Sequence, residues 1–237
     1  MFCFKKKPLT VEQLIKRSQR YSPFEQEKFD EIVLRIYADK KQATPKRFGL
    51  RLIVISDTHG HLAYGPERFP DFMSGIPQYD LCILLGDVSP YDIDEIVKII
   101  PKEKIIAVKG NHDLFDVYEG FEIEEISGKV IERCGVKFAG IEGSFRYKNK
   151  AFPSFTQYES LALAEKIPPC DVLLTHDSMF VHSRNDAAHA GLAGITYYVY
   201  KNAPTAHIQG HLHKSFEKVY DNGTLHKCVY LCEYVEI

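Results

Sequence analysis

The chain has 237 residues, of which 45% are hydrophobic and 26% are charged. This composition is typical of a soluble globular protein, and the length allows one large domain with a sizeable core. Thirty basic and thirty-two acidic side chains give a formal net charge of −2, so no chain-wide basic field favours binding to nucleic acid or anionic lipid.

The apolar runs and the cysteines indicate where in the cell the protein is expected. The longest apolar runs, such as residues 81–85, are far shorter than a membrane span, so we expect no transmembrane helix and no membrane partner. The first seven residues turn charged before an apolar signal core can form, which predicts a cytoplasmic protein. Six scattered cysteines without a Cys-x-x-Cys pair indicate buried reduced thiols rather than a cysteine-based zinc site.

Residues 1–48 are predicted to form a separate N-terminal helical extension. Thr10 and Ser22 each begin a capping-box pattern, and Pro23 occupies the first helical position of the second. In the second predicted helix, apolar side chains recur at helical spacing at Phe29, Ile32, Val33, Ile36 and Tyr37. We expect this stripe to pack on the rest of the chain rather than to bind a partner.

Residues 49–237 are predicted to form an α/β domain. Short β-rich apolar runs each end in a small or polar residue, at 50–56, 81–85, 104–108, 171–175 and 206–209. Helical stretches lie between some of them, at 93–100 and 156–167, and the second opens with a capping box at Thr156. The alternation predicts that functional loops follow the carboxyl ends of the strands.

Two turn signals add antiparallel strands to this domain. Cys134-Gly135 separates residues 130–133 from 136–141, and Asp221-Asn222-Gly223 separates residues 216–220 from a last strand region that ends near Tyr234. A mixed sheet, or a pair of sheets, is therefore expected.

Residue types that bind metal ions follow five of the predicted strands. They occur in the fragments Asp57-Thr58-His59, Gly86-Asp87, Gly110-Asn111-His112-Asp113, His176-Asp177 and Gly210-His211-Leu212-His213. A single Asp or His after a strand is as often a helix cap or an ordinary loop residue as a ligand. Five such fragments in order, each where a loop leaves a strand, are hard to obtain by accident and indicate one shared site.

The order Asp-x-His, Gly-Asp, Gly-Asn-His-Asp, His and Gly-His-x-His resembles that of the calcineurin-like metallophosphoesterases over roughly residues 50–216. This resemblance implies a four-layer α/β/β/α sandwich with a dinuclear metal centre at one edge of its two sheets. It also implies that Asp87 bridges both metals. The first metal would further bind Asp57, His59 and His213, and the second Asn111, His176 and His211.

The residue types agree with a pair of divalent transition-metal ions. Two cations held ~3.5–4 Å apart repel each other and need a bridging anion and several donors around them. A mixture of imidazole and carboxylate favours Mn²⁺, which we expect first, or Fe²⁺, Co²⁺, Ni²⁺ or Zn²⁺ over Ca²⁺ or a lone Mg²⁺. The neutral amide of Asn111 would leave the second metal the stronger Lewis acid.

His112 is expected to act in catalysis rather than as a ligand. The resemblance places it beside the leaving-group oxygen, where a protonated imidazole serves as general acid, and Asp113 is expected to hold its other ring nitrogen. A metal-bridging hydroxide would attack phosphorus in line. Arg146 is interpreted either as a phosphate contact or as an ordinary surface arginine, and His182, Asp186 and His189 lie in a segment where this family commonly builds its substrate pocket.

Several activities within the family remain open. Gly86-Asp87 continues as Val88-Ser89-Pro90, without the Asp-Arg-Gly that is typical of the protein phosphatases. The near-neutral charge does not favour a nucleic-acid substrate. A small phosphodiester such as a nucleotide is the favoured substrate, and a phosphomonoester is the alternative. A catalytically silent protein-binding scaffold is disfavoured because every ligand position and His112 are present.

Overall fold

The computed structural model describes residues 40–66, 68–147, 152–180 and 188–237. The two helices predicted near the N-terminus lie outside these ranges, so the boundary at residue 48 stays a prediction. Within the described ranges, no helix is both long and apolar enough to span a membrane.

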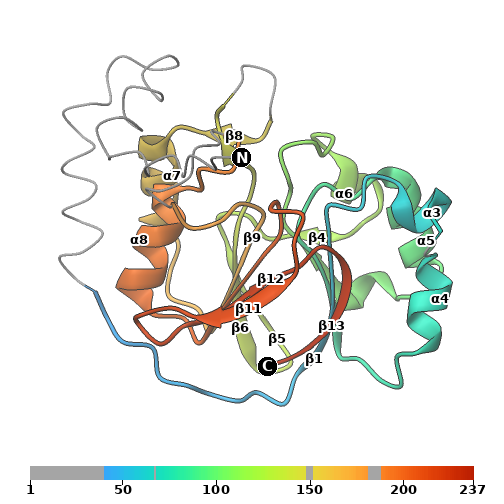
Figure 1. Ribbon diagram of the computed structural model, residues 1–237, viewed down its shortest axis with the longest axis horizontal. Helices are drawn as coiled ribbons and strands as arrows, with labels where there is room; N and C mark the ends of the chain where they lie inside the picture. The colour runs from blue at the N-terminus through green and yellow to red at the C-terminus, as the bar shows by residue number, and fades with distance from the viewer. Residues whose placement is uncertain (1–39, 67, 148–151, 181–187) are drawn as a thin grey trace, which may run out of the picture.

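Two large mixed β-sheets form the centre of the molecule (Figure 1). The first has the order β13-β1-β2-β3-β4, in which β1 to β4 run parallel and β13 pairs antiparallel with β1. Its strands are β1 (Arg51–Ser56), β2 (Leu81–Leu84), β3 (Ile105–Ala107), β4 (Glu124–Glu125) and β13 (Leu231–Glu236).

The second large sheet has the order β11-β12-β10-β9-β6-β5, with antiparallel pairs only at its two edges. Its strands are β5 (Val130–Arg133), β6 (Val136–Ile141), β9 (Val172–Thr175), β10 (Ala206–Gln209), β11 (Phe216–Val219) and β12 (Leu225–Cys228). A separate two-stranded sheet joins β7 (Ser144–Phe145) and β8 (Ser154–Phe155).

Helices cover the outer face of each large sheet (Figure 1). The five-stranded sheet is covered by α3 (His61–Tyr64), α4 (Phe69–Ser74), α5 (Pro90–Val97) and α6 (Val117–Gly120), with a short 3₁₀ helix, η1 (Lys102–Lys104), before β3. The six-stranded sheet is covered by α7 (Gln157–Ala164) and α8 (Ala193–Asn202). The predicted four-layer α/β/β/α sandwich is confirmed.

Three apolar cores fill the spaces between the four layers. Successive strand residues point to opposite faces, so Leu52 and Val54 of β1 enter the core between the two sheets, whereas Ile53 and Ile55 enter the core under α3, α4 and α5. Because both faces of the central strands are covered, these strands read as unbroken apolar runs instead of alternating ones.

Most predicted elements match the structure, and the last hairpin is the main exception. The capping box of α7 forms at Thr156, and α5 begins at Pro90, three residues before the predicted start. The strand region expected after the Asp221 turn is divided in two: β12 pairs with β10 and β11, whereas β13 pairs with β1 in the other sheet. Leu231, at φ 60°, breaks the extended backbone between them.

Candidate metal centre

The seven predicted ligands lie on loops that leave five strands of the two sheets. Three of these strands, β1, β2 and β3, belong to one sheet, and β9 and β10 belong to the other. All five run parallel within their sheets, so the loops meet at the same edge of the sandwich. The structure therefore brings together segments that are more than 150 residues apart in the chain.

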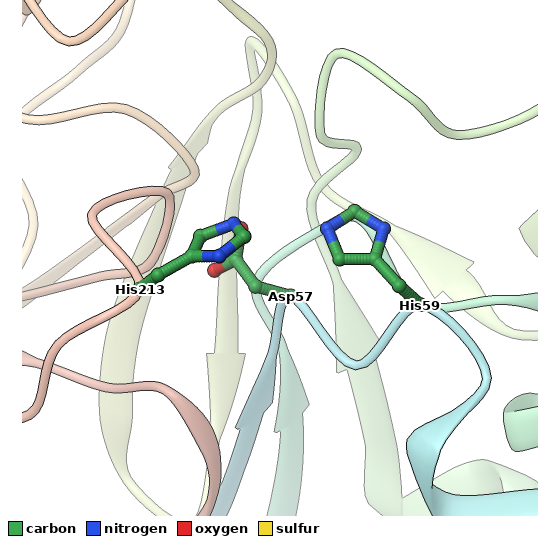
Figure 2. A group of neighbouring side chains, drawn as sticks. All are labelled: Asp57, His59 and His213. Atoms are coloured by element: carbon green, nitrogen blue, oxygen red, sulfur yellow. The ribbon is translucent and has the colours of Figure 1, made fainter.

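One group of potential ligand atoms is made by Asp57, His59 and His213, whose atoms all lie within 4.8 Å of one another. Figure 2 shows Asp57 at the end of β1, with the His213 ring overlapping its carboxylate in this view and the His59 ring to the right. Nε2 of His213 lies 3.4 Å from Oδ1 of Asp57. Asp57 is fully buried, whereas both histidines reach solvent.

A second group is made by Asp57, His176 and His211, and it is buried throughout. Nε2 of His176 lies 3.1 Å from Nδ1 of His211 and 3.2 Å from Oδ1 of Asn111. The predicted ligands of the second metal are therefore in mutual contact.

The hydrogen bonds of this group decide which ring nitrogens carry lone pairs. Nδ1 of His176 lies 2.7 Å from the Leu85 carbonyl, and Nε2 of His211 lies 2.8 Å from the Ala188 carbonyl. Because a carbonyl only accepts, each of these nitrogens donates a proton, and the facing nitrogens and the Asn111 oxygen are acceptors directed at one another. Oδ1 of Asp57 is also buried without a hydrogen-bond donor. Such a cluster favours a positive charge among its atoms, which either a proton on His176 or a metal ion supplies, and the donor set fits divalent cations.

Asp87 lies between the two groups. Its Oδ2 is 3.6 Å from Nε2 of His176 and 4.0 Å from Nε2 of His59. Burial raises the pKa of Asp87, but His176 and the hydrogen bond from the His112 backbone outweigh it and the net shift is downward. Burial lowers the pKa of His176, and the carboxylates of Asp87 and Asp57 raise it to a net upward shift. Asp57 belongs to both groups, so it shares with Asp87 the place between them.

The backbone around these ligands is strained. Nine non-glycine residues of the described ranges have positive φ, and five of them are predicted ligands: Asp57, His59, Asp87, His211 and His213. Left-handed backbone is unfavourable for side chains with a Cβ and persists at functional sites, where surrounding contacts enforce it. A side chain at Gly110 would overlap the Asp87 carboxylate, so this close approach of two loops requires glycine.

A family model described as the calcineurin-like phosphoesterase superfamily domain matches residues 50–228, most of the chain. The chain belongs to this family. Metal-dependent hydrolysis of phosphate esters is the chemistry of calcineurin-like phosphoesterases, and the match spans all five ligand-bearing loops. No curated protein sequence matches the chain.

Solved structures share the calcineurin-like phosphoesterase fold at low sequence identity. Phosphopantetheinyl hydrolase from Mycobacterium tuberculosis superposes with a TM-score of 0.52 at 14% identity, covering 78% of this chain and 91% of that one. A putative 5′-nucleotidase from Staphylococcus aureus superposes with a TM-score of 0.50 at 13% identity, covering 79% of this chain and 54% of that one. These similarities concern the fold.

His112 stands at the rim of the centre. Its ring centroid lies 6.0 Å from that of His59, and its backbone N–H donates to Oδ1 of Asp87 at 2.8 Å. The side chain is exposed and is not part of either group of ligand atoms. This position leaves the imidazole accessible to a substrate.

Asp113 does not take the position predicted for it. Instead of holding the His112 ring, its carboxylate accepts hydrogen bonds from the backbone N–H groups of Gly110, Asp87 and Val88 at 2.8–3.1 Å. The Tyr118 hydroxyl donates to it as well, at 3.2 Å. Burial raises the pKa of Asp113 to about 7. Asp113 thus joins the loop after β2 to the loop after β3.

Asp92, a residue that the sequence reasoning missed, supports the loop of His59. The carboxylate is fully buried and accepts hydrogen bonds from the Thr58 hydroxyl and the Gly60 N–H at 2.6 Å each and from the Ala63 N–H at 2.8 Å. Ser89 caps α5 by accepting from the Asp92 N–H. The pattern Ser-x-x-Asp at residues 89–92 was a signal that could have located this position.

The remaining candidate residues of the site have different surroundings. Arg146 forms an ion pair with Glu159 at 2.8 Å and donates to the Ser154 carbonyl, which favours the surface-arginine interpretation. Tyr230, also missed from the sequence, stacks on His213 with ring centroids 5.2 Å apart. His189 lies beside His211, whereas His182 and Asp186 fall outside the described residues.

Proposed function

We propose that the chain hydrolyses small phosphate esters with two divalent transition-metal ions, Mn²⁺ first among them, and prefers diesters to monoesters. One observation carries the proposal: acceptor atoms of His176, His211 and Asn111 are directed at one another, with the Asp57 and Asp87 carboxylates beside them. Asp57, His59 and His213 would hold one ion and Asn111, His176 and His211 the other, with Asp87 between them.

The protein's own groups have separate tasks in this reaction. When bound, two divalent cations would neutralise charge on the phosphoryl oxygens and acidify a water molecule between them. The imidazole of His112 is exposed, and the backbone N–H of this residue is bonded to Asp87; the imidazole would donate a proton to the oxygen of the leaving group. No group of the chain needs to form a covalent bond to phosphorus.

Charge near His112 supports the preference for diesters. A cavity of about 460 Å³ adjoins the loop that follows His112 and is lined by Asp116, Glu119, Glu122, Glu124, Glu125, Lys109 and Lys129. Two of its carboxylates form ion pairs with bases outside the lining, Glu122 with Lys102 and Glu124 with Arg133, so a small excess of negative charge remains. A diester carries one negative charge, whereas a monoester carries close to two near neutral pH. The negative surroundings therefore disfavour the monoester more strongly.

The test compares two chromogenic esters. Protein stripped with chelator and reloaded with Mn²⁺ should cleave bis-p-nitrophenyl phosphate faster than p-nitrophenyl phosphate, and the stripped protein should cleave neither. Faster cleavage of the monoester would show a phosphomonoesterase instead. No cleavage of either ester with any of Mn²⁺, Fe²⁺, Co²⁺, Ni²⁺ or Zn²⁺ would favour the protein-binding scaffold.

A further inference from the structure

Exposed apolar side chains gather around the ligand-bearing loops. Eight large hydrophobic residues of the described ranges are exposed, and four of them lie within five residues of His59, Asp87 or His112 along the chain: Tyr64, Tyr91, Leu114 and Phe115. A fifth, Phe152, donates its backbone N–H to the Asn111 carbonyl at 3.3 Å. Exposed apolar side chains that cluster beside a polar centre are candidates for a binding surface.

Two of these residues form a ring pair on the side of the centre where His112 lies. The ring centroids of Phe115 and Phe152 are 5.9 Å apart at an interplanar angle of 31°, and the side chains are 71% and 55% exposed. Phe115 follows His112 by three residues in the chain. The backbone N–H of Phe152 donates to the carbonyl of Asn111, the residue that precedes His112. The pair therefore lies next to the Asn111–His112 segment.

The charges around this pair restrict what it can bind. Nζ of Lys109 lies 5.3 Å from the Phe115 ring centroid, but it also pairs with Glu142 at 3.6 Å. Phe115 lines the cavity described above, which keeps a small excess of acidic over basic side chains. A second phosphate, or a polynucleotide strand, would find no excess of positive charge here, so an uncharged group with an apolar face is the occupant that fits.

We propose that Phe115 and Phe152 form a subsite for the leaving group of the substrate and bind a planar aromatic ring, as in a nucleoside. The inference rests on the proposed function, because a general acid at His112 requires the leaving group to lie on this side of the centre. Phenyl faces attract flat rings without hydrogen bonds, and such stacking tolerates different bases. The subsite thus selects nucleoside-like esters by shape and apolar contact.

The experiment compares two inhibitors that differ only by the base. Adenosine 5′-monophosphate and ribose 5-phosphate compete with bis-p-nitrophenyl phosphate for the Mn²⁺-loaded full chain, and the ratio of their inhibition constants isolates the base. We expect adenosine 5′-monophosphate to bind about tenfold more tightly than ribose 5-phosphate in the wild type. The ratio should fall to about one in the double variant Phe115→Ala/Phe152→Ala. The matched control, Tyr64→Ala/Tyr91→Ala, removes the other exposed pair, whose rings are 5.3 Å apart, and should keep the wild-type ratio.

A second measurement does not depend on turnover. In saturation-transfer NMR with Zn²⁺ as a diamagnetic metal, the adenine H2 and H8 protons should receive saturation from the wild type and lose it in the phenylalanine variant. An unchanged ratio and unchanged transfer in that variant, or a loss confined to the tyrosine variant, would overturn the subsite while leaving the proposed hydrolysis intact. Transfer to adenine without cleavage of any ester would instead retain the subsite and contradict the hydrolase.

Discussion

The two groups of predicted ligands differ in how they are held. The side chains of His176 and His211 are 0% and 6% exposed, and each donates a ring N–H to a backbone carbonyl. The side chains of His59 and His213 are 39% and 49% exposed. The buried pair comes from the six-stranded sheet, and its orientation is fixed by hydrogen bonds.

This difference in burial suggests that the two ligand groups have different roles within one metal centre. A buried position with oriented ligands is preorganised, because its donors cannot turn away in the absence of a cation. An exposed position keeps access for water and for the phosphate oxygens, as catalytic metal sites require. We therefore expect the buried group to determine assembly of the centre and the exposed group to determine access to substrate.

Replacement of His176 by alanine should have the largest effect. The change removes the ring that touches Asn111 and His211 and leaves the Leu85 carbonyl without its donor. We expect activity to fall more than about 1,000-fold, one metal equivalent to be lost in elemental analysis, and the metal-free protein to lose about 1–3 kcal/mol in urea unfolding. Wild-type metal content in this variant would show that the buried group is not a ligand set.

The matched change in the exposed group is His59→Ala. We expect it to lose the other metal equivalent and to lower activity about 100-fold to 1,000-fold. Its stability without metal should stay within about 0.5 kcal/mol of the wild type, because the side chain is exposed. Equal destabilisation by the two substitutions would remove the distinction between a preorganised half and an open half.

His112→Ala separates proton donation from metal binding. With an ester whose leaving group is an alkoxide, turnover should fall about 100-fold, because the alkoxide requires a proton. With p-nitrophenolate as the leaving group the loss should be below about tenfold, since this anion leaves without protonation. Both metal equivalents should remain. Loss of a metal, or an equal decrease with both esters, would contradict a role for His112 as general acid.

Asp92→Asn tests whether the Asp92 carboxylate positions the loop that carries His59. The amide keeps the shape of the carboxylate but removes the charge that accepts from Thr58, Gly60 and Ala63. We expect metal affinity to fall about 10-fold to 100-fold, as for other residues that orient metal ligands. The control is Asp94→Asn on the same helix, where the carboxylate is exposed and pairs with Lys98. Equal effects of the two substitutions would mean that Asp92 does not position the His59 loop.

The sequence predicted the strands and the site loops because both depend on local patterns, whereas the four layers were predicted from the resemblance that the ligand motifs carry. Apolar runs that end in a polar residue specify buried parallel strands, and the loops after such strands meet at one edge whatever the details of packing. Asp57, Asp87 and His211 could therefore be placed together without coordinates. The structure agrees, because the loop of Asp57 forms hydrogen bonds with the loops of Asp87 and His211.

Features that depend on contacts between distant segments could not be predicted in the same way. Asp113 follows His112 directly, yet its carboxylate turns to three backbone N–H groups because these were otherwise buried without an acceptor. The division of the last strand region depends on the left-handed backbone conformation of Leu231. Leucine rarely adopts this conformation, so the residue type gives no signal of a turn. In both cases at least one deciding partner lies in another part of the chain.

The smallest effect is expected at the opposite end of the same strands, where Arg51 begins β1 and Asp80 precedes β2. The Arg51 guanidinium donates to both oxygens of Asp80 at 2.8 and 3.0 Å, and this contact lowers the pKa of Asp80. A lowered carboxyl pKa stabilises the fold above the pKa of the unfolded state and loses that effect as the pH falls through the folded value. Asp80→Asn should therefore lower Tm by about 1–2 °C from pH 7 to pH 5, and the difference should shrink only below about pH 4. Metal content and turnover should equal those of the wild type. A change in either would show that the two ends of these strands are coupled.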